Sequence, residues 1–344
     1  NPKYWQNVNT ERIWLELEVG VSLDDPEIAA FLESFGLVEP LKRSMHPHLT
    51  NFFVFEKSGT TSADIINMAE AAKSVTGVLF LEPSVIYTGQ IVPNDPMWNQ
   101  QWGPYAVYAD EAWEYGLGGS SLNMMAVLDD AIDWLHEDQY NQVWYGYDYG
   151  FNDNDPTLDG TEQTHGTHVT GIMSATTNNG IGIAGMCNDT VFFAKVTDNT
   201  YFTQNGTYSD VAITNAMYDI ADNIPRVTVI NLSLGGGAPS ASAEQAYNYA
   251  WNNGKLPIAA SGNDGNSSVS YPAAYSACMA VGAIGSSGND LYLTQYSNYG
   301  NAQEISAPGG DINTGYGIMS SVPDNNYEAL EGTSMACPMV AGLA

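Results

Sequence analysis

Basic residues are scarce in this chain of 344 residues. Nine lysines and arginines stand against 39 aspartates and glutamates, which gives a formal net charge of -30. A surface of that charge repels the phosphates of nucleic acids and the headgroups of anionic membranes, and it favours solubility. We therefore expect no nucleic-acid partner and no attachment to a membrane surface.

Cysteines and long apolar runs are also few. Cys187, Cys278 and Cys337 occur in small or apolar surroundings, which indicates buried small side chains rather than a disulfide framework or a zinc cluster. The pattern leaves one disulfide open. No apolar run reaches 18 residues, so we expect no membrane-spanning helix. The chain begins at Asn1, which fits removal of an initiator segment by processing or cloning and leaves the compartment open.

The basic residues are unevenly distributed, which suggests a boundary near residue 90. Residues 1–91 carry six of the nine. Their apolar patterns predict a small α+β unit with a β-α-β-β-α-β order. It has strands at 12–19, 51–57 and 77–83, a further strand within 37–45, and helices at 25–36 and 62–75. Segment 84–103 has no sustained periodicity, and we interpret it as a linker.

Short apolar runs alternate with helical patterns from residue 92 onward. Each run is too short for a helix and suits a strand that is buried on both faces of a parallel sheet. The sequence therefore predicts an α/β domain over 92–344, in which a site would lie beyond the carboxyl ends of the strands. The runs are 123–128, 191–196, 227–234, 256–261 and 278–284.

The first candidates for site chemistry are Asp129, His165 and His168. Asp129 directly follows a predicted strand, where it could orient a histidine or only form a turn or helix cap. The histidines stand three apart at the start of an apolar helix, but HExxH is absent and no third ligand has zincin spacing. Metal catalysis is therefore not expected. His165 could project into a cleft as a base, whereas His168 favours the core.

Two further positions are Asn263 and Ser334. Asn263 follows the strand at 256–261, where its amide could cap a turn or donate to a developing oxyanion. Ser334 lies among very small residues in EGTSMACPMVAG, at the expected start of a helix. Pro338 would then fall within or just after the first turn, where its missing N–H costs least. A serine at the positive end of a helix suits a nucleophile.

Five blocks in chain order resemble those of the subtilisin-like serine proteases, the subtilases. They are AVLDDAID, HGTHVTGI, VINLSLGGG, AASGNDG and EGTSMACPMVAG. The order Asp, His, Ser is that of this fold. The resemblance implies a subtilisin-like α/β sheet flanked by helices and a secreted serine endopeptidase. Asp129 would be the orienting acid, His165 the base, Ser334 the nucleophile and Asn263 an oxyanion donor.

The resemblance also implies substrate and calcium residues. Backbone of Ser233, Leu234 and Gly235 would pair with an extended protein or peptide substrate, and the primary pocket would be formed by Ala260, Ser261, Gly262 and, at its floor, Ser270. Because that floor carries no charge, we expect a preference for apolar or mixed substrate side chains before the scissile bond. A structural calcium ion would be held by Asp95, Asp138, Thr177, Asn179, Ile181 and Ile183. No organic cofactor is expected.

Residues 1–91 resemble the inhibitory propeptide of such enzymes in size and element order. The small α+β unit, of ferredoxin-like type, would then be an intramolecular inhibitor of the peptidase domain at 92–344, and an unrelated accessory domain is the alternative.

Two features depart from the family pattern. Asp130 and Ala131 replace Thr or Ser and then Gly after the catalytic Asp, which adds a charge beside the triad. The chain ends at Ala344, where the family continues, so we expect an incomplete peptidase domain. A catalytically weak binding or scaffold protein and an esterase on the same fold are the competing interpretations.

Overall fold

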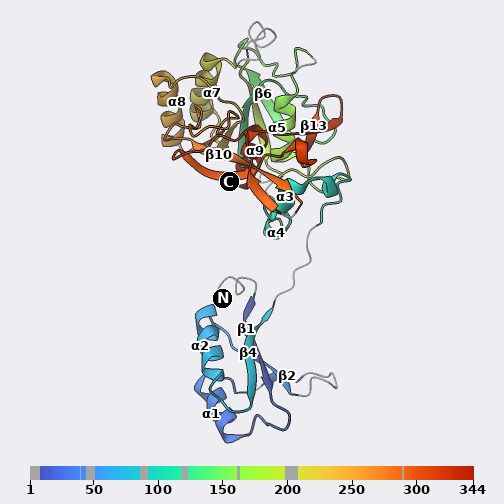
Figure 1. Ribbon diagram of the computed structural model, residues 1–344, viewed down its shortest axis with the longest axis vertical. Coiled ribbons are helices and arrows are strands. Elements are labelled where there is room, and N and C mark those ends of the chain that lie inside the picture. Colours follow the sequence, from blue (N-terminus) through green and yellow to red (C-terminus); the bar gives the residue numbers. More distant parts are fainter. Residues whose placement is uncertain are drawn as a thin grey trace. The chain divides into compact units, whose positions relative to one another are not determined.

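A computed structural model describes residues 8–38, 40–43, 51–85, 92–117, 123–160, 163–197, 208–288 and 290–344. The chain divides into two units, Asn1–Gly89 and Gln90–Ala344 (Figure 1). Each unit has its own hydrophobic core.

The larger unit is built on a mostly parallel sheet, as its apolar runs predict. The strand order is β11-β10-β9-β8-β5-β7-β6, with β12 paired to β10, and only the β10–β11 pair is antiparallel. All six residues of β5 (Met124–Asp129) are buried. The other strands are β6 (Val143–Asp148), β7 (Thr190–Lys195), β8 (Val227–Leu232), β9 (Leu256–Ala260), β10 (Met279–Ser287), β11 (Asp290–Leu293) and β12 (Gln303–Pro308).

Helices cover both faces of this sheet. Met125 and Val127 of β5 belong to one core, with residues of α5 (His165–Ser174) and α9 (Thr333–Leu343). The intervening Ala126 and Leu128 belong to a second core, with α7 (Asp210–Asn223) and α8 (Ala241–Asn252) (Figure 1). This alternation follows from the two-residue period of a strand. The two helix layers therefore bury both faces of the sheet.

Shorter elements complete the larger unit. They are η2 (Trp98–Gln100), α3 (Trp102–Ala106), α4 (Ala109–Ala112), η3 (Ile312–Thr314) and the antiparallel hairpin of β13 (Ile318–Val322) and β14 (Asn326–Leu330). Neither the hairpin nor β6 stood out as an apolar run in the sequence. Their burial patterns are interrupted by exposed or half-buried residues, which explains why.

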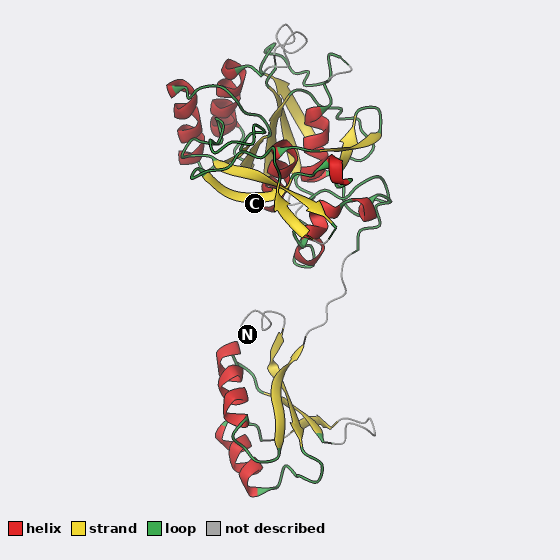
Figure 2. Ribbon diagram, viewed as in Figure 1, coloured by secondary structure: helices red, strands yellow, loops and turns green. Residues whose placement is uncertain are grey.

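The smaller unit has two helices on one face of an antiparallel sheet of order β2-β3-β1-β4 (Figure 2). Its elements follow the predicted β-α-β-β-α-β order. Residues 39, 44 and 45 of the strand expected within 37–45 lie outside the described residues. The bounds are β1 (Val8–Leu17), α1 (Pro26–Ser34), β2 (Pro40–Arg43), β3 (Phe52–Glu56), α2 (Ser62–Ala72) and β4 (Val78–Val85).

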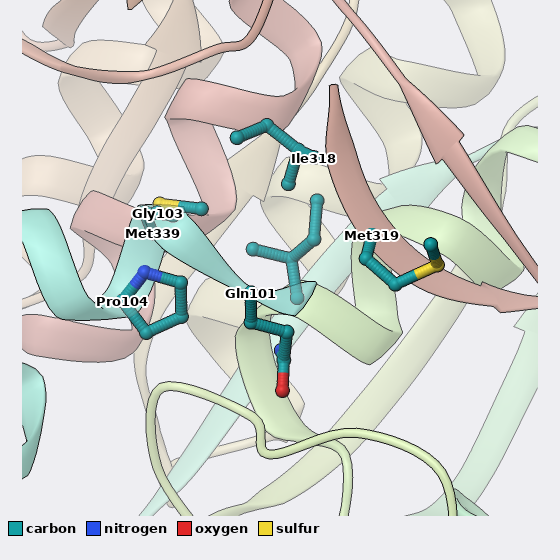
Figure 3. A pocket seen from close by; sticks show the side chains of 7 residues that line it. Gln101, Gly103, Pro104, Ile318, Met319 and Met339 are labelled. Atoms are coloured by element: carbon teal, nitrogen blue, oxygen red, sulfur yellow. The ribbon is translucent and has the colours of Figure 1, made fainter. Parts of the chain in front are cut away.

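The linker predicted over 84–103 is wrong in its second half. Residues 86–91 lie outside the described residues, but Gln101 is buried and its amide bonds the N–H and carbonyl of Ala184, both at 2.8 Å. Gly103 and Pro104 line a narrow apolar space together with Ile318, Met319 and Met339 (Figure 3). A Cβ at Gly103 would lie 2.4 Å from Met339 Cε. The second half of this segment therefore packs closely within the larger unit although it lacks periodicity.

The cysteine and membrane expectations can also be compared with the structure. Cys187, Cys278 and Cys337 are all buried and free, so the disulfide left open by the sequence is not formed. Within the described ranges, no helix combines the length and apolar character needed to cross a membrane.

Candidate active site

Asp129 and His165 come from the carboxyl end of β5 and the first residue of α5. Asp129 Oδ1 lies 2.8 Å from His165 Nδ1. Burial alone lowers the pKa of His165, but the charge of Asp129, the hydrogen bond to it and the charge of Asp130 raise that pKa above its usual range. With Nδ1 bonded to the carboxylate, Nε2 is left to accept a proton.

Asp130 caps the helix that carries His165. This fully buried carboxylate accepts hydrogen bonds from the N–H of Gly166 at 2.7 Å and of His165 at 3.3 Å. Burial and the charge of Asp129 raise the pKa of Asp130 to about 6. The sequence showed only an extra charge here, whereas the structure has a carboxyl group that accepts from the free N–H groups at the start of α5.

Ser334 is the second residue of α9, which packs against α5. Its hydroxyl donates to the carbonyl of Ser233 at 3.1 Å rather than to His165. In return, the Ser233 hydroxyl donates to the carbonyl of Ser334 at 2.8 Å. The two serines are therefore joined by a reciprocal pair of hydrogen bonds.

Pro338 lies just after the first turn of α9, which begins at Thr333, as expected. The expectation that its missing N–H costs least there is wrong. Its missing N–H would otherwise bond the carbonyl of Ser334, four residues earlier. The Ser233 hydroxyl supplies the hydrogen bond that the proline cannot.

Two donors converge beside Gly332. Asn263 Oδ1 accepts from the N–H of Thr333 at 2.9 Å and from its hydroxyl at 2.8 Å, which leaves Nδ2 to face elsewhere. A Cβ on Gly332 would lie 3.6 Å from both Asn263 Nδ2 and the N of Ser334. Both donors thus border one small space, as an oxyanion hole requires. Gly332 has a φ of 149°, which favours glycine.

A cavity of about 580 Å³ adjoins the end of β8. Leu234 and Gly235 line it, as do four tyrosines at 208, 247, 271 and 275. Ser233 is buried and exchanges hydrogen bonds with Ser334. Of the expected backbone set, two residues therefore line this cavity and the third bonds the expected nucleophile.

The residues expected at the primary pocket lie together after β9. Ala260 and Ser261 are buried, and the Ser261 hydroxyl bonds the carbonyl of Asn298, so only the backbone of Ser261 can face a pocket. A Cβ on Gly262 would lie 2.4 Å from Ser270 Oγ, which places these two residues in contact. Asn298 Nδ2 lies 3.2 Å from Ser270 Oγ, a buried partner that no local pattern identified.

The expected calcium residues are also neighbours. Asp95 accepts from the N–H of Asn178 at 2.9 Å and of Asn179 at 3.4 Å. Asp138 Oδ1 faces Asn179 Nδ2 at 2.7 Å, and Asp138 Oδ2 accepts from the N–H of Ile183 at 2.8 Å. Burial raises the pKa of both carboxyls, that of Asp138 to about 6. Thr177 and Ile181 lie on the same loop.

The core assignment of His168 is confirmed. The side chain is fully buried, its Nε2 lies 3.0 Å from the carbonyl of Glu328, and burial lowers its pKa to about 3. It is therefore neutral and does not take part in proton transfer at the site.

The model of the subtilase family of peptidases S8 matches residues 123–344. The chain belongs to the subtilase family. It is 41% identical over 271 residues to a thermophilic serine proteinase of a Bacillus species, an alignment that covers 78% of this chain and 62% of that relative. It is 37% identical over 254 residues to thermitase of Thermoactinomyces vulgaris, covering 73% and 84%. This subtilase thus spans less than two thirds of the first relative.

A solved protease from Pseudoalteromonas arctica has the same fold. The TM-score is 0.63 at 29% identity, over 73% of this subtilase and 85% of that chain. The family and the fold expected from the five blocks are therefore confirmed, and residues 123–344 form a peptidase S8 domain.

Proposed function

We propose that this subtilase is a secreted serine endopeptidase that cleaves peptide bonds through an acyl-enzyme, with Asp129, His165 and Ser334 as its triad. The observation that carries the proposal is the 2.8 Å bond from Asp129 to His165, together with the two donors that converge beside Gly332. A binding or scaffold protein would need neither feature.

The catalytic step begins with a movement of the Ser334 hydroxyl. It must leave the Ser233 carbonyl so that His165 Nε2 can take its proton while Oγ attacks the substrate carbonyl. Asn263 Nδ2 and the N–H of Ser334 then stabilise the oxyanion. His165 then returns the proton to the leaving amine. In the second half-reaction His165 takes a proton from water, the water oxygen attacks the acyl carbon, and Ser334 Oγ leaves and regains the proton.

Protein and peptide substrates would bind in extended form along Leu234 and Gly235, as an added strand. The tyrosines of the adjoining cavity favour apolar or aromatic side chains. Ser270 offers no charge to a basic side chain, so we expect apolar or mixed specificity. The net charge of -30 opposes nucleic acid as a partner.

A structural calcium ion fits the carboxylates of Asp95 and Asp138. Both are buried, and in the described part of the chain no lysine or arginine forms an ion pair with either. Calcium prefers oxygen ligands from a flexible loop. Asn179 would turn its amide oxygen inward, and the carbonyls of Thr177, Ile181 and Ile183 would complete the set.

We further propose that residues 1–91 are an intramolecular inhibitor and that the chain is a proenzyme. The support is the element order of the smaller unit, the position of this unit directly before the peptidase domain, and the family assignment. Secretion is supported by the printed name of one relative, an extracellular serine protease of Natrialba magadii that is 37% identical over 270 residues.

Labelling with a fluorophosphonate serine probe, followed by mass spectrometry, tests the triad. The probe should modify Ser334 in the parent protein, and Ser334→Ala should lose both labelling and casein hydrolysis. We expect a loss on the order of 10⁶ in turnover, the scale known for triad residues in subtilisin. Casein cleavage by Ser334→Ala at the parent rate would refute the nucleophile. An unlabelled parent would favour a scaffold, and turnover of esters without casein would favour an esterase.

A further inference from the structure

Tyr208 lies just before α7 and contacts the triad. Its hydroxyl oxygen is 3.0 Å from Asp129 Oδ1 and 3.4 Å from His165 Nδ1. We propose that Tyr208 is a positioning residue of the triad, whose hydroxyl fixes the Asp129 carboxylate and limits how strongly that carboxylate raises the basicity of His165. This inference rests on the triad proposed above.

The hydrogen bonds to Asp129 are distributed unevenly between its two oxygens. Oδ1 accepts from the N–H of Asp130 at 2.8 Å, from His165 Nδ1 at 2.8 Å and from Tyr208 at 3.0 Å. Oδ2 is buried, and no partner bonds it within the described residues. The three donors thus select one orientation of the carboxylate, the one in which Oδ1 faces the histidine.

The Tyr208 hydroxyl acts as a donor in this arrangement. Burial and the charges of Asp129 and Asp130 raise the pKa of the phenol well above its usual range, so it keeps its proton at any working pH. A proton given to Oδ1 stabilises the negative charge there. The carboxylate therefore stabilises a charged His165 less strongly, which keeps the pKa of this histidine closer to the working pH, as a general base requires.

The ring of Tyr208 has a second environment. It lines the cavity of about 580 Å³ beside Leu234 and Gly235, so the residue connects the proposed substrate cleft with the triad acid. Tyr208→Phe retains the ring in the cavity and removes only the hydroxyl. The variant therefore separates support of the triad from packing against substrate.

The test is steady-state kinetics of Tyr208→Phe in the full chain, with a peptide amide substrate at several pH values. Because a hydrogen bond to a charged group is among the stronger ones, we expect kcat to fall about tenfold with KM within about twofold of the parent. Without the donor, the Asp129 charge acts more strongly on His165, so the acidic limb of kcat/KM should move to higher pH by about half a unit.

Tyr149→Phe is the matched control. The Tyr149 hydroxyl donates to the Asp219 carboxylate at 2.5 Å and, within the described part of the chain, bonds no triad residue, so its loss should leave kcat and the acidic limb unchanged. A Tyr208→Phe enzyme with the parent's kcat and pH profile would overturn the proposal. So would equal shifts in both variants.

Titration of His165 by NMR in a Ser334→Ala background gives a second readout that does not need activity. Tyr208→Phe should raise the pKa of His165 there, and an unchanged pKa would overturn the inference. If the parent is not labelled by the serine probe, the proposed function fails, yet this titration still decides the role of Tyr208. If the parent is labelled and Tyr208→Phe has no effect, only the inference fails.

Discussion

Ser233 donates its hydroxyl to the backbone carbonyl of Ser334, with 2.8 Å between the oxygens. Pro338 leaves that carbonyl without its helical donor, since α9 begins at Thr333 and the fifth residue onward in a helix normally donates four positions back. The turn that bears the proposed nucleophile is therefore held by the side chain of Ser233, the residue that follows β8. Because β8 contacts α9, the Ser233 hydroxyl can replace the missing helical N–H donor.

Ser233→Ala should destabilise the protein, because it leaves a buried carbonyl without a partner. We expect a loss of about 1–3 kcal/mol in the free energy of unfolding, together with a lower kcat. Urea unfolding of the inactive Ser334→Ala form measures the first, and peptide hydrolysis measures the second.

Pro338→Ala supplies the internal control for that prediction. An alanine N–H at 338 can donate to the Ser334 carbonyl, so Pro338→Ala should recover part of the stability lost in Ser233→Ala. Additive effects of the two substitutions would show that they do not share this carbonyl.

Asn263→Ala should lower kcat by roughly 10²–10³ with little change in KM, the range typical of one oxyanion donor in a subtilase. Thr333→Val removes the hydroxyl that bonds Asn263 Oδ1 but keeps the backbone N–H, so a smaller loss is expected. Kinetics of both variants on one peptide amide show which substitution lowers kcat more. A higher KM with an unchanged kcat for Asn263→Ala would assign the residue to substrate binding.

Asp130→Asn should change the pH dependence of stability. The folded-state pKa of Asp130 is raised to about 6 from an unfolded value of 3.8. Its stabilising contribution is therefore fully present below pH 3.8 and is lost as the pH rises through 6. Asparagine cannot ionise, so the variant should gain thermal stability relative to the parent at pH 8 and gain little at pH 4.

Asp130→Asn should also change the pH dependence of activity. The Asp130 charge helps to raise the pKa of His165, so Asp130→Asn should move the acidic limb of kcat/KM to lower pH. Melting curves and pH–rate profiles of one preparation test both effects. A limb that moves upward would mean that the helix cap, rather than the charge, is the main contribution of Asp130.

Removal of calcium should destabilise the Ser334→Ala protein, because a ligand of the folded state adds about 2.7 kcal/mol at a hundredfold excess over Kd. The stabilisation should weaken from pH 7 to pH 5, since Asp138, with a pKa raised to about 6, becomes protonated and loses its charge. Melting with calcium, with chelator, and with chelator plus magnesium measures the effect. The site would be contradicted if magnesium restored the full melting temperature, or if calcium stabilised Asp138→Ala as much as the parent.

The sequence by itself determined the parallel sheet and the family. An uninterrupted apolar run such as 124–128 has one stable placement, buried on both faces of a sheet, and this property is local to the run. The polar residues that follow such runs, Asp129 and Asn263 among them, were identifiable for the same reason. The hairpin of β13 and β14 was not, because β13 buries the polar residues Ser320 and Ser321 and β14 is exposed or half-buried along its length.

Only the tertiary structure decided what surrounds these residues. Tyr208 and Asp129 are 79 positions apart, and Ser233 and Ser334 are 101 apart; no local pattern contains either pair. The apparent linker over 84–103 and the cost of the missing N–H at Pro338 were misjudged on the same ground. Composition records the preference of a segment taken alone, whereas a hydrogen bond or a close glycine contact depends on which distant segment the packed core places beside it.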